Sequence, residues 1–129
     1  KGNLWGADLT NVEADHVDLS GCDLRSVDFT GADLTRANLS GADLRGAILR
    51  KCKLVGAELV GANLQGVDLA DSDMRWANLR NSDLCWANLS SVDLRGASME
   101  GAIRSPKISG MFAGRAPRPA RFRPVADSA

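Results

Sequence analysis

The sequence predicts an all-β solenoid in which short extended segments wind into about five square coils. Three observations predict this fold. A five-residue pattern repeats without a break from residue 3 to residue 102. One position of each repeat is large and apolar, and the position two residues before it is small. Aromatic residues make up only 5% of the chain, so an aromatic-rich globular core is excluded.

The large apolar position begins at Leu4 and recurs every five residues up to Met99. Sixteen of the twenty copies are Leu, and only Ala14 is not large. A period of five fits neither a helix, with its period of 3.6, nor a flat strand, with its period of 2. We therefore expect the chain to turn a corner every five residues. Residues two apart in extended backbone point to the same side, so the Leu and the small residue should both face inward.

The residue just before each Leu is Asp or Asn in fifteen of twenty copies, and it should point outward between the two inward positions. Gly recurs two residues after the Leu, where a corner favours it. Four such units close a square coil of twenty residues. Because stacked strands lie about 4.8 Å apart, twenty units predict five coils and a rod roughly 24 Å long.

The segments GADLT, RANLS, GADLR, GANLQ and WANLR resemble the A(D/N)LXX motif of pentapeptide-repeat proteins. The resemblance covers about four-fifths of the chain and implies a right-handed quadrilateral β-helix. Ala14 departs from the motif, but Val12 and Val17 replace the usual Ala on either side of it, which roughly keeps the interior volume.

Charge divides the chain into two predicted regions. Residues 1–103, the expected β-helix, carry ten Lys/Arg and fifteen Asp/Glu, whereas residues 104–129 carry six Lys/Arg and one Asp. The basic region also contains prolines, which favour an extended tail. Solenoids need caps at their ends. We expect Ile108, Met111 and Phe112 to fold over the last coil, and we expect Arg115, Arg118, Arg121 and Arg123 to bind a partner.

Catalysis needs convergent groups in a pocket, and the sequence offers none. His16 is the only histidine, and Asp15 and Asp18 beside it do not complete a metal site. Cys22 and Cys52 occupy the small inward position and should be buried, while Cys85 should face outward. We therefore predict no enzyme activity, no cofactor and no metal.

The three tryptophans are the main candidates for partner binding, because exposed Trp is enriched at protein interfaces. Trp5 and Trp86 should lie outward on the same face, on the first and last coils, and Trp76 should lie on the opposite face. These separated positions do not form one continuous patch.

The expected function is a structural or protein–protein interaction module, with protein partners and no direct contact with nucleic acid or membrane. Three arrangements stay open for such a module: membership of a larger assembly, fusion to an upstream domain, and oligomers formed by end-to-end stacking. The alternative is DNA mimicry, because the family that the chain resembles includes acidic rods that inhibit or protect DNA gyrase, a type II topoisomerase. The start at Lys1 indicates an excised or processed piece. The odd number of cysteines, with no framework spacing, favours a reducing, cytoplasmic location.

Overall fold

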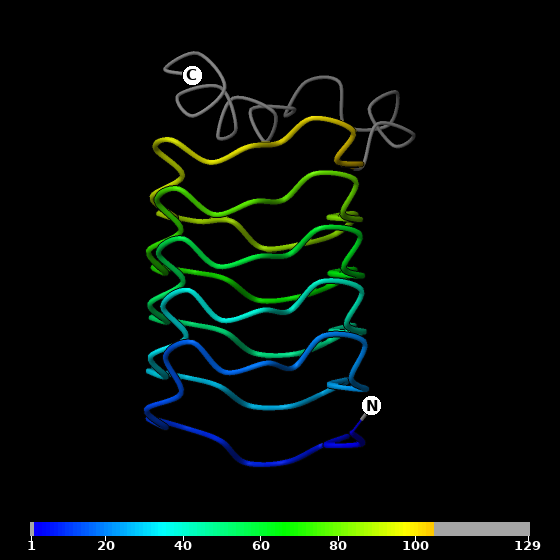
Figure 1. Cartoon of the computed structure of the whole chain (residues 1–129), viewed down its shortest axis with the longest axis vertical. Helices are drawn as coiled ribbons and strands as arrows, with labels where there is room; N and C mark the ends of the chain where they lie inside the picture. The colour runs from blue at the N-terminus through cyan, green and yellow to red at the C-terminus, as the bar shows by residue number, and fades with distance from the viewer. Residues whose placement is uncertain (1, 105–129) are drawn as a thin grey trace.

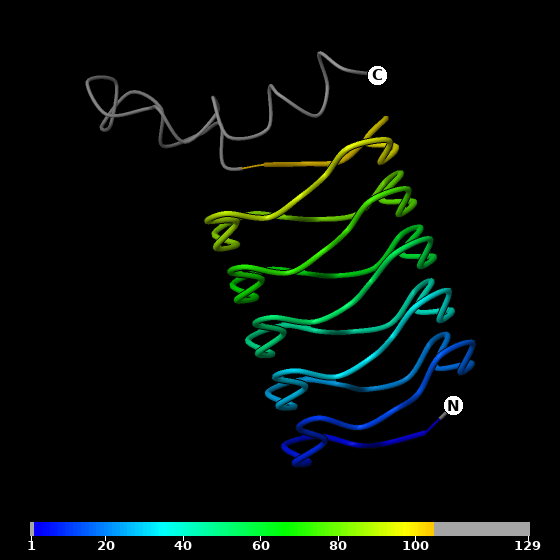
Figure 2. The same cartoon turned by 90° about the vertical axis from the view of Figure 1, so that its left-hand side faces the viewer.

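The computed structural model describes residues 2–104, which form one continuous stack of coils (Figure 1). Each residue that begins a bridge pairs in parallel with the residue twenty positions later, from Asn3↔Asp23 to Asp83↔Ile103. These are isolated one-residue bridges, one for every five residues, and the described part of the chain contains no helix. A coil is therefore twenty residues long. Figure 2 shows the same coils from the side, stacked one above the other.

Backbone hydrogen bonds join each coil to the next in the same pattern on all four sides. Around Leu24, for example, the amide of Leu24 donates to the carbonyl of Asp43 at 2.8 Å, and the amide of Asp43 donates to the carbonyl of Cys22 at 3.0 Å. The amide of Ser26 also donates to the carbonyl of Arg45, at 3.1 Å. This ladder satisfies the backbone groups that an extended chain would otherwise leave unpaired.

Each corner is a tight turn closed by a hydrogen bond from the small residue back to the preceding Leu, such as Ala47 N to Leu44 O at 2.9 Å. The second residue of every turn has a positive φ, and the first does not, which is the signature of a type II turn. Half of these corner residues are glycine. The others include Trp76 and Trp86, with φ of 63° and 65°.

The interior is filled by the two inward columns, as the repeat predicts. Leu24, Leu44 and Leu64 are fully buried in successive coils, and Cys22 and Cys52 are buried in the small column. Burial raises the pKa of the Cys52 thiol to about 12, so this cysteine is an inert core residue. In the first coil the inward residues are only partly buried, because a neighbouring coil covers them on one side alone.

The outward Asp and Asn have a structural role that the period alone does not reveal. Oδ1 of Asp28 accepts hydrogen bonds from the backbone N–H of Thr30 at 2.9 Å and from its hydroxyl at 2.6 Å. The same bond to the backbone two residues later recurs in other repeats, for example from Ser40 to Asn38 at 3.0 Å. The side chain thus holds the chain at the entrance to each corner, which explains the preference for Asp and Asn.

Among residues 2–104 there is no helix of the length and apolar character needed to cross a bilayer. The predicted cap at Ile108, Met111 and Phe112, the four tail arginines and all but the first residue of the predicted region 104–129 lie outside the described residues.

Candidate functional site

The rod has four sides and four corners. We name each side by the outward residue that forms the bridge in the first coil, and each corner by the first-coil residue that has a positive φ. The Glu13 side carries two outward columns, and the His16 corner follows it. From the first to the fifth coil, the first column of this side is Glu13, Asp33, Lys53, Asp73 and Asp93. The second column is Asp15, Thr35, Val55, Arg75 and Arg95. The His16 corner holds His16, Arg36, Gly56, Trp76 and Gly96. The Asn3 side carries Asn3, Asp23, Asp43, Asn63 and Asp83, with Trp5, Arg25, Arg45, Gln65 and Cys85 beside them.

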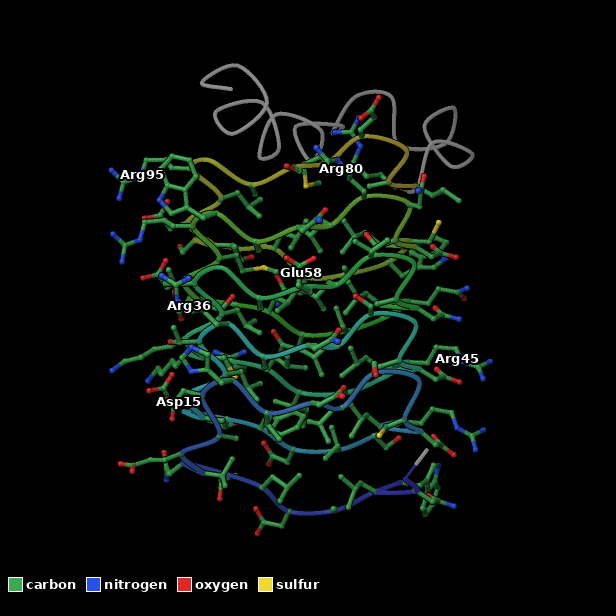
Figure 3. All side chains as sticks on the ribbon, viewed as in Figure 1. Asp15, Arg36, Arg45, Glu58, Arg80 and Arg95 are labelled. Atoms are coloured by element: carbon green, nitrogen blue, oxygen red, sulfur yellow. The ribbon has the colours of Figure 1, made fainter. Side chains whose placement is uncertain are left out.

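Figure 3 shows Asp15, Arg36 and Arg95 along one edge of the rod, with Arg45 on the other edge. Glu58 and Arg80 lie between these edges. The surface of the rod is therefore divided into distinct sides with different side chains, even though the backbone is nearly the same on each.

All three tryptophans lie on the surface, with exposed fractions of 61% for Trp5, 70% for Trp76 and 62% for Trp86. Trp5 and Trp86 flank the corner after the Asn3 side, in the first and fifth coils. Trp76 is at the His16 corner, on the other side of the rod. The structure therefore does not bring the three together, in agreement with their spacing in the sequence.

Trp76 lies flat on the coil that follows it. A Cβ atom added to Gly96 would be 2.5 Å from Cε3 and 2.7 Å from Cδ2 of the indole ring, so only glycine leaves room for the ring there. One face of the ring is thus supported by the backbone of the fifth coil, while most of the ring surface is open to solvent. The positive φ of Trp76 is shared by the second residue of every corner, so it belongs to the turn and the placement of the ring is what distinguishes this residue.

Arginine and aspartate form bidentate pairs within single repeats. Nε of Arg75 donates to Oδ1 of Asp73 at 2.9 Å, and Nη2 donates to Oδ2 at 2.8 Å. Arg95 and Asp93 form the same pair one coil above, also on the Glu13 side. Two further pairs, Asp23 with Arg25 and Asp43 with Arg45, lie on the Asn3 side.

These pairs change the electrostatics of the outward acids. The hydrogen bond from Arg25 lowers the pKa of Asp23 to about 2, and the hydrogen bond from Arg95 lowers the pKa of Asp93 to about 2. The carboxylates are therefore fully ionised but neutralised locally. The spacing Asp-x-Arg signals these pairs in the sequence, although the five-residue period does not.

Residues 2–104 contain no group of three or more His, Cys, Asp or Glu side chains that could hold a metal ion. His16 Nδ1 lies 3.3 Å from Asp15 Oδ2 on the surface. Cys85 is half-buried, and its thiol lies 3.1 Å from the carbonyl oxygen of Arg104. These residues form no catalytic arrangement in the described part of the chain.

The family model described as pentapeptide repeats matches eight copies, over residues 1–31, 28–66 and 68–103. No protein among those with curated descriptions matches the chain. The chain is similar to a pentapeptide repeat protein from the thylakoid lumen of Arabidopsis thaliana, with 33% identity and a TM-score of 0.67. This match covers 77% of the present chain and 66% of the Arabidopsis chain.

A second similar structure is HetL from the cyanobacterium Nostoc sp. strain PCC 7120, a pentapeptide repeat protein involved in the regulation of heterocyst differentiation. Identity is 28%, the TM-score is 0.55, and the match covers 80% of this chain and 60% of HetL. QnrB1, a plasmid-mediated fluoroquinolone resistance protein, matches with 23% identity and a TM-score of 0.36, over 88% of this chain and 65% of QnrB1. The chain thus spans less than two thirds of the length of each of these proteins. The family model and the Arabidopsis and Nostoc matches confirm the right-handed quadrilateral β-helix.

Proposed function

Because the chain belongs to the pentapeptide-repeat family, we propose that it is a non-enzymatic protein-binding module whose contact surface is centred on Trp76. The observation that carries this proposal is the placement of the ring: it is 70% exposed and rests on Gly96. A rigid aromatic side chain loses little conformational freedom on binding, and Trp and Arg are the residues most often found at the energetic centres of interfaces.

The surroundings of Trp76 also favour a protein partner. The Arg75 and Arg95 guanidinium groups are held in place by Asp73 and Asp93, so they are ordered before a partner arrives. Each still has N–H groups that are not used in the bidentate pair and can donate to carbonyl oxygens of a partner. Such ordering reduces the entropic cost of association.

The proposal is tested by affinity capture from an extract of the source organism, with quantitative mass spectrometry of the retained proteins. We expect a partner that is retained by the wild type and by Trp5→Ala, and lost from Trp76→Ala. Retention of every partner by Trp76→Ala would contradict a surface centred on Trp76, and loss of a partner from Trp86→Ala alone would move the centre to Trp86. A chain lacking residues 105–129 shows in the same experiment whether the basic region contributes.

DNA mimicry is the second candidate, and the observation that favours it is the column Asn3, Asp23, Asp43, Asn63 and Asp83, which repeats at the spacing of the coils. Electrostatic imitation of DNA needs a field of one sign. Arg25 and Arg45 neutralise two of the three acids in this column, so we place mimicry second. A gyrase supercoiling assay tests it. If the chain neither inhibits nor protects gyrase at micromolar concentration, this candidate is eliminated.

A further inference from the structure

We call the part of the His16 corner that holds Trp76 the Trp76 corner. A group of cations lies below it, on the third coil. Arg36 belongs to the second coil, but a Cβ atom added to Gly56 would be 3.4 Å from Cγ of Arg36. The aliphatic stem of Arg36 therefore lies against the third coil, directly below the position of Trp76 in the twenty-residue register. Lys53 and Val55 lie on the adjoining Glu13 side of that same coil.

Arg36, Lys51 and Lys53 form what we call the basic belt, which crosses the Glu13 side from one corner to the other. All three side chains are exposed. Within residues 2–104, none of the three forms an ion pair, in contrast to the four arginines of the bidentate pairs. These cations also replace the residues expected in an ideal repeat, since Lys53 stands where Asp or Asn is usual.

Acidic residues lie on the coils above and below the belt. Asp33 lies one coil below Lys53, and Asp71 lies one coil above Lys51 at the same corner. Asp73, directly above Lys53, is already paired with Arg75. Asp15, beside His16 at the corner one coil below Arg36, is a third carboxylate with no arginine partner among residues 2–104. The belt is therefore a row of exposed cations without ion pairs in this part of the chain, on a rod whose total charge is negative, with carboxylates on the neighbouring coils.

Building on the proposed protein-binding function, we propose that the Trp76 corner and the basic belt together bind a short peptide segment of a partner protein that carries one or two carboxylates next to a bulky apolar side chain. The apolar side chain lies on the open face of Trp76. The carboxylates contact Arg36 and Lys53, and Val55 provides a partly buried apolar surface between these charges.

The pattern of charges around the basic belt favours a short acidic peptide over a nucleic acid as the ligand. A phosphate backbone is bound by extended basic surfaces, because affinity depends on the number of phosphates neutralised. The basic belt has three cations, and carboxylates lie on the coils above and below it. A segment with few negative charges fits this pattern, whereas a duplex would meet Asp33, Asp73 and Asp93 along the same side.

The ligand is identified by subtractive selection from a displayed library of random twelve-residue peptides. The complete chain, residues 1–129, is immobilised, and the Arg36→Glu/Lys53→Glu variant of the complete chain is added in solution in excess. The competitor keeps residues 104–129 and the rest of the rod, so it removes peptides that bind elsewhere. Both changes are at exposed positions, and circular dichroism checks that the variant is folded.

We expect the surviving peptides to carry Asp or Glu within a few residues of an aromatic or large aliphatic residue. Fluorescence anisotropy with one such peptide should show a Kd at least about tenfold weaker for Trp76→Ala and for Lys53→Glu. Trp5→Ala and Arg50→Gln should change Kd less than about twofold, because Trp5 lies on another side and Arg50 is paired with Asp68.

The outcomes separate the two proposals. Peptides that are recovered only when the competitor is left out, lack acidic residues and still need Trp76 would overturn the acidic ligand and leave the proposed function standing. An unchanged Kd for Trp76→Ala, or the absence of any peptide that survives the subtraction, would also overturn this inference. Displacement of the peptide by a duplex oligonucleotide at a concentration below the peptide's own Kd would assign the surface to nucleic acid instead.

Discussion

At the scale of single residues, the outward Asp side chains combine two tasks. Each accepts a backbone N–H at the entrance to a corner, and some also hold an arginine from the same repeat. An acidic surface in this fold is therefore in large part a requirement of the corners. The charges that lack such a structural task, including Lys53 and Arg36, are more informative about binding.

Acid should weaken the rod through these carboxylates. The pKa of Asp93 is about 2 in the folded chain, below the ordinary value of 3.8, so its contribution to stability is complete above about pH 4. The contribution is lost as the pH falls from about 4 to about 2. Urea unfolding at pH 7, 4 and 2.5 should show this loss. Between pH 4 and pH 2.5, the free energy of unfolding of Asp93→Asn should fall less than that of the wild type. An equal loss in both would contradict the assignment.

Gly96→Ala should be more damaging than an alanine at an open corner. At Gly41, φ is +69° and no atom lies within 4 Å of an added Cβ, so Gly41→Ala should cost only the left-handed backbone penalty, about 1 kcal/mol. At Gly96 the added methyl group also collides with the Trp76 ring, which should raise the total cost to roughly 2–3 kcal/mol.

A double-mutant cycle isolates the collision. In a Trp76→Gly background the ring is absent, so Gly96→Ala should there cost no more than Gly41→Ala, as measured by urea unfolding. If the cost of Gly96→Ala is the same with and without Trp76, the ring does not lie on Gly96 in solution.

At the scale of the five-residue element, the repeat assigns a direction to each side chain. Leu44 is fully buried in the third coil, whereas its neighbour Asp43 is on the surface and paired with Arg45. Leu44→Asp should unfold the rod, because it places a charge in an apolar interior. Asp43→Ser should cost less than about 1 kcal/mol, since exposed ion pairs contribute little. Thermal unfolding followed by circular dichroism compares the two, and similar tolerance of both would show that the register is wrong.

Most of this element could be predicted from sequence because one interaction dominates each inward position. The burial of Leu44 and Cys52 follows from period and residue size alone. The bidentate pair of Asp73 and Arg75 does not, because a period reports which side a residue faces and not which neighbour it contacts. The position of Trp76 over Gly96 was missed for a related reason: it depends on the left-handed backbone at the corner.

At the scale of the whole molecule, the twenty-residue coil turns distant sequence positions into neighbours. Arg36, Lys53 and Trp76 are separated along the chain, but the parallel register brings them to adjacent coils on one side of the rod. The sequence indicated Trp76 as a candidate for binding, yet the basic belt below it becomes a single surface only once the coils are stacked. Function in this account therefore lies where residues depart from the repeat.

The most direct test of that claim replaces one residue that departs from the repeat with the residue usual at that position. Trp76→Gly restores the residue usual at a corner and relieves a bulky residue of a positive φ, so the free energy of unfolding should stay within about 1 kcal/mol of the wild type. The measurement is retention of the captured partner by this variant, with thermal unfolding of the same preparation as its control. We predict a rod as stable as the wild type that no longer retains the partner. A stable Trp76→Gly rod that retains the partner as well as the wild type would contradict the account.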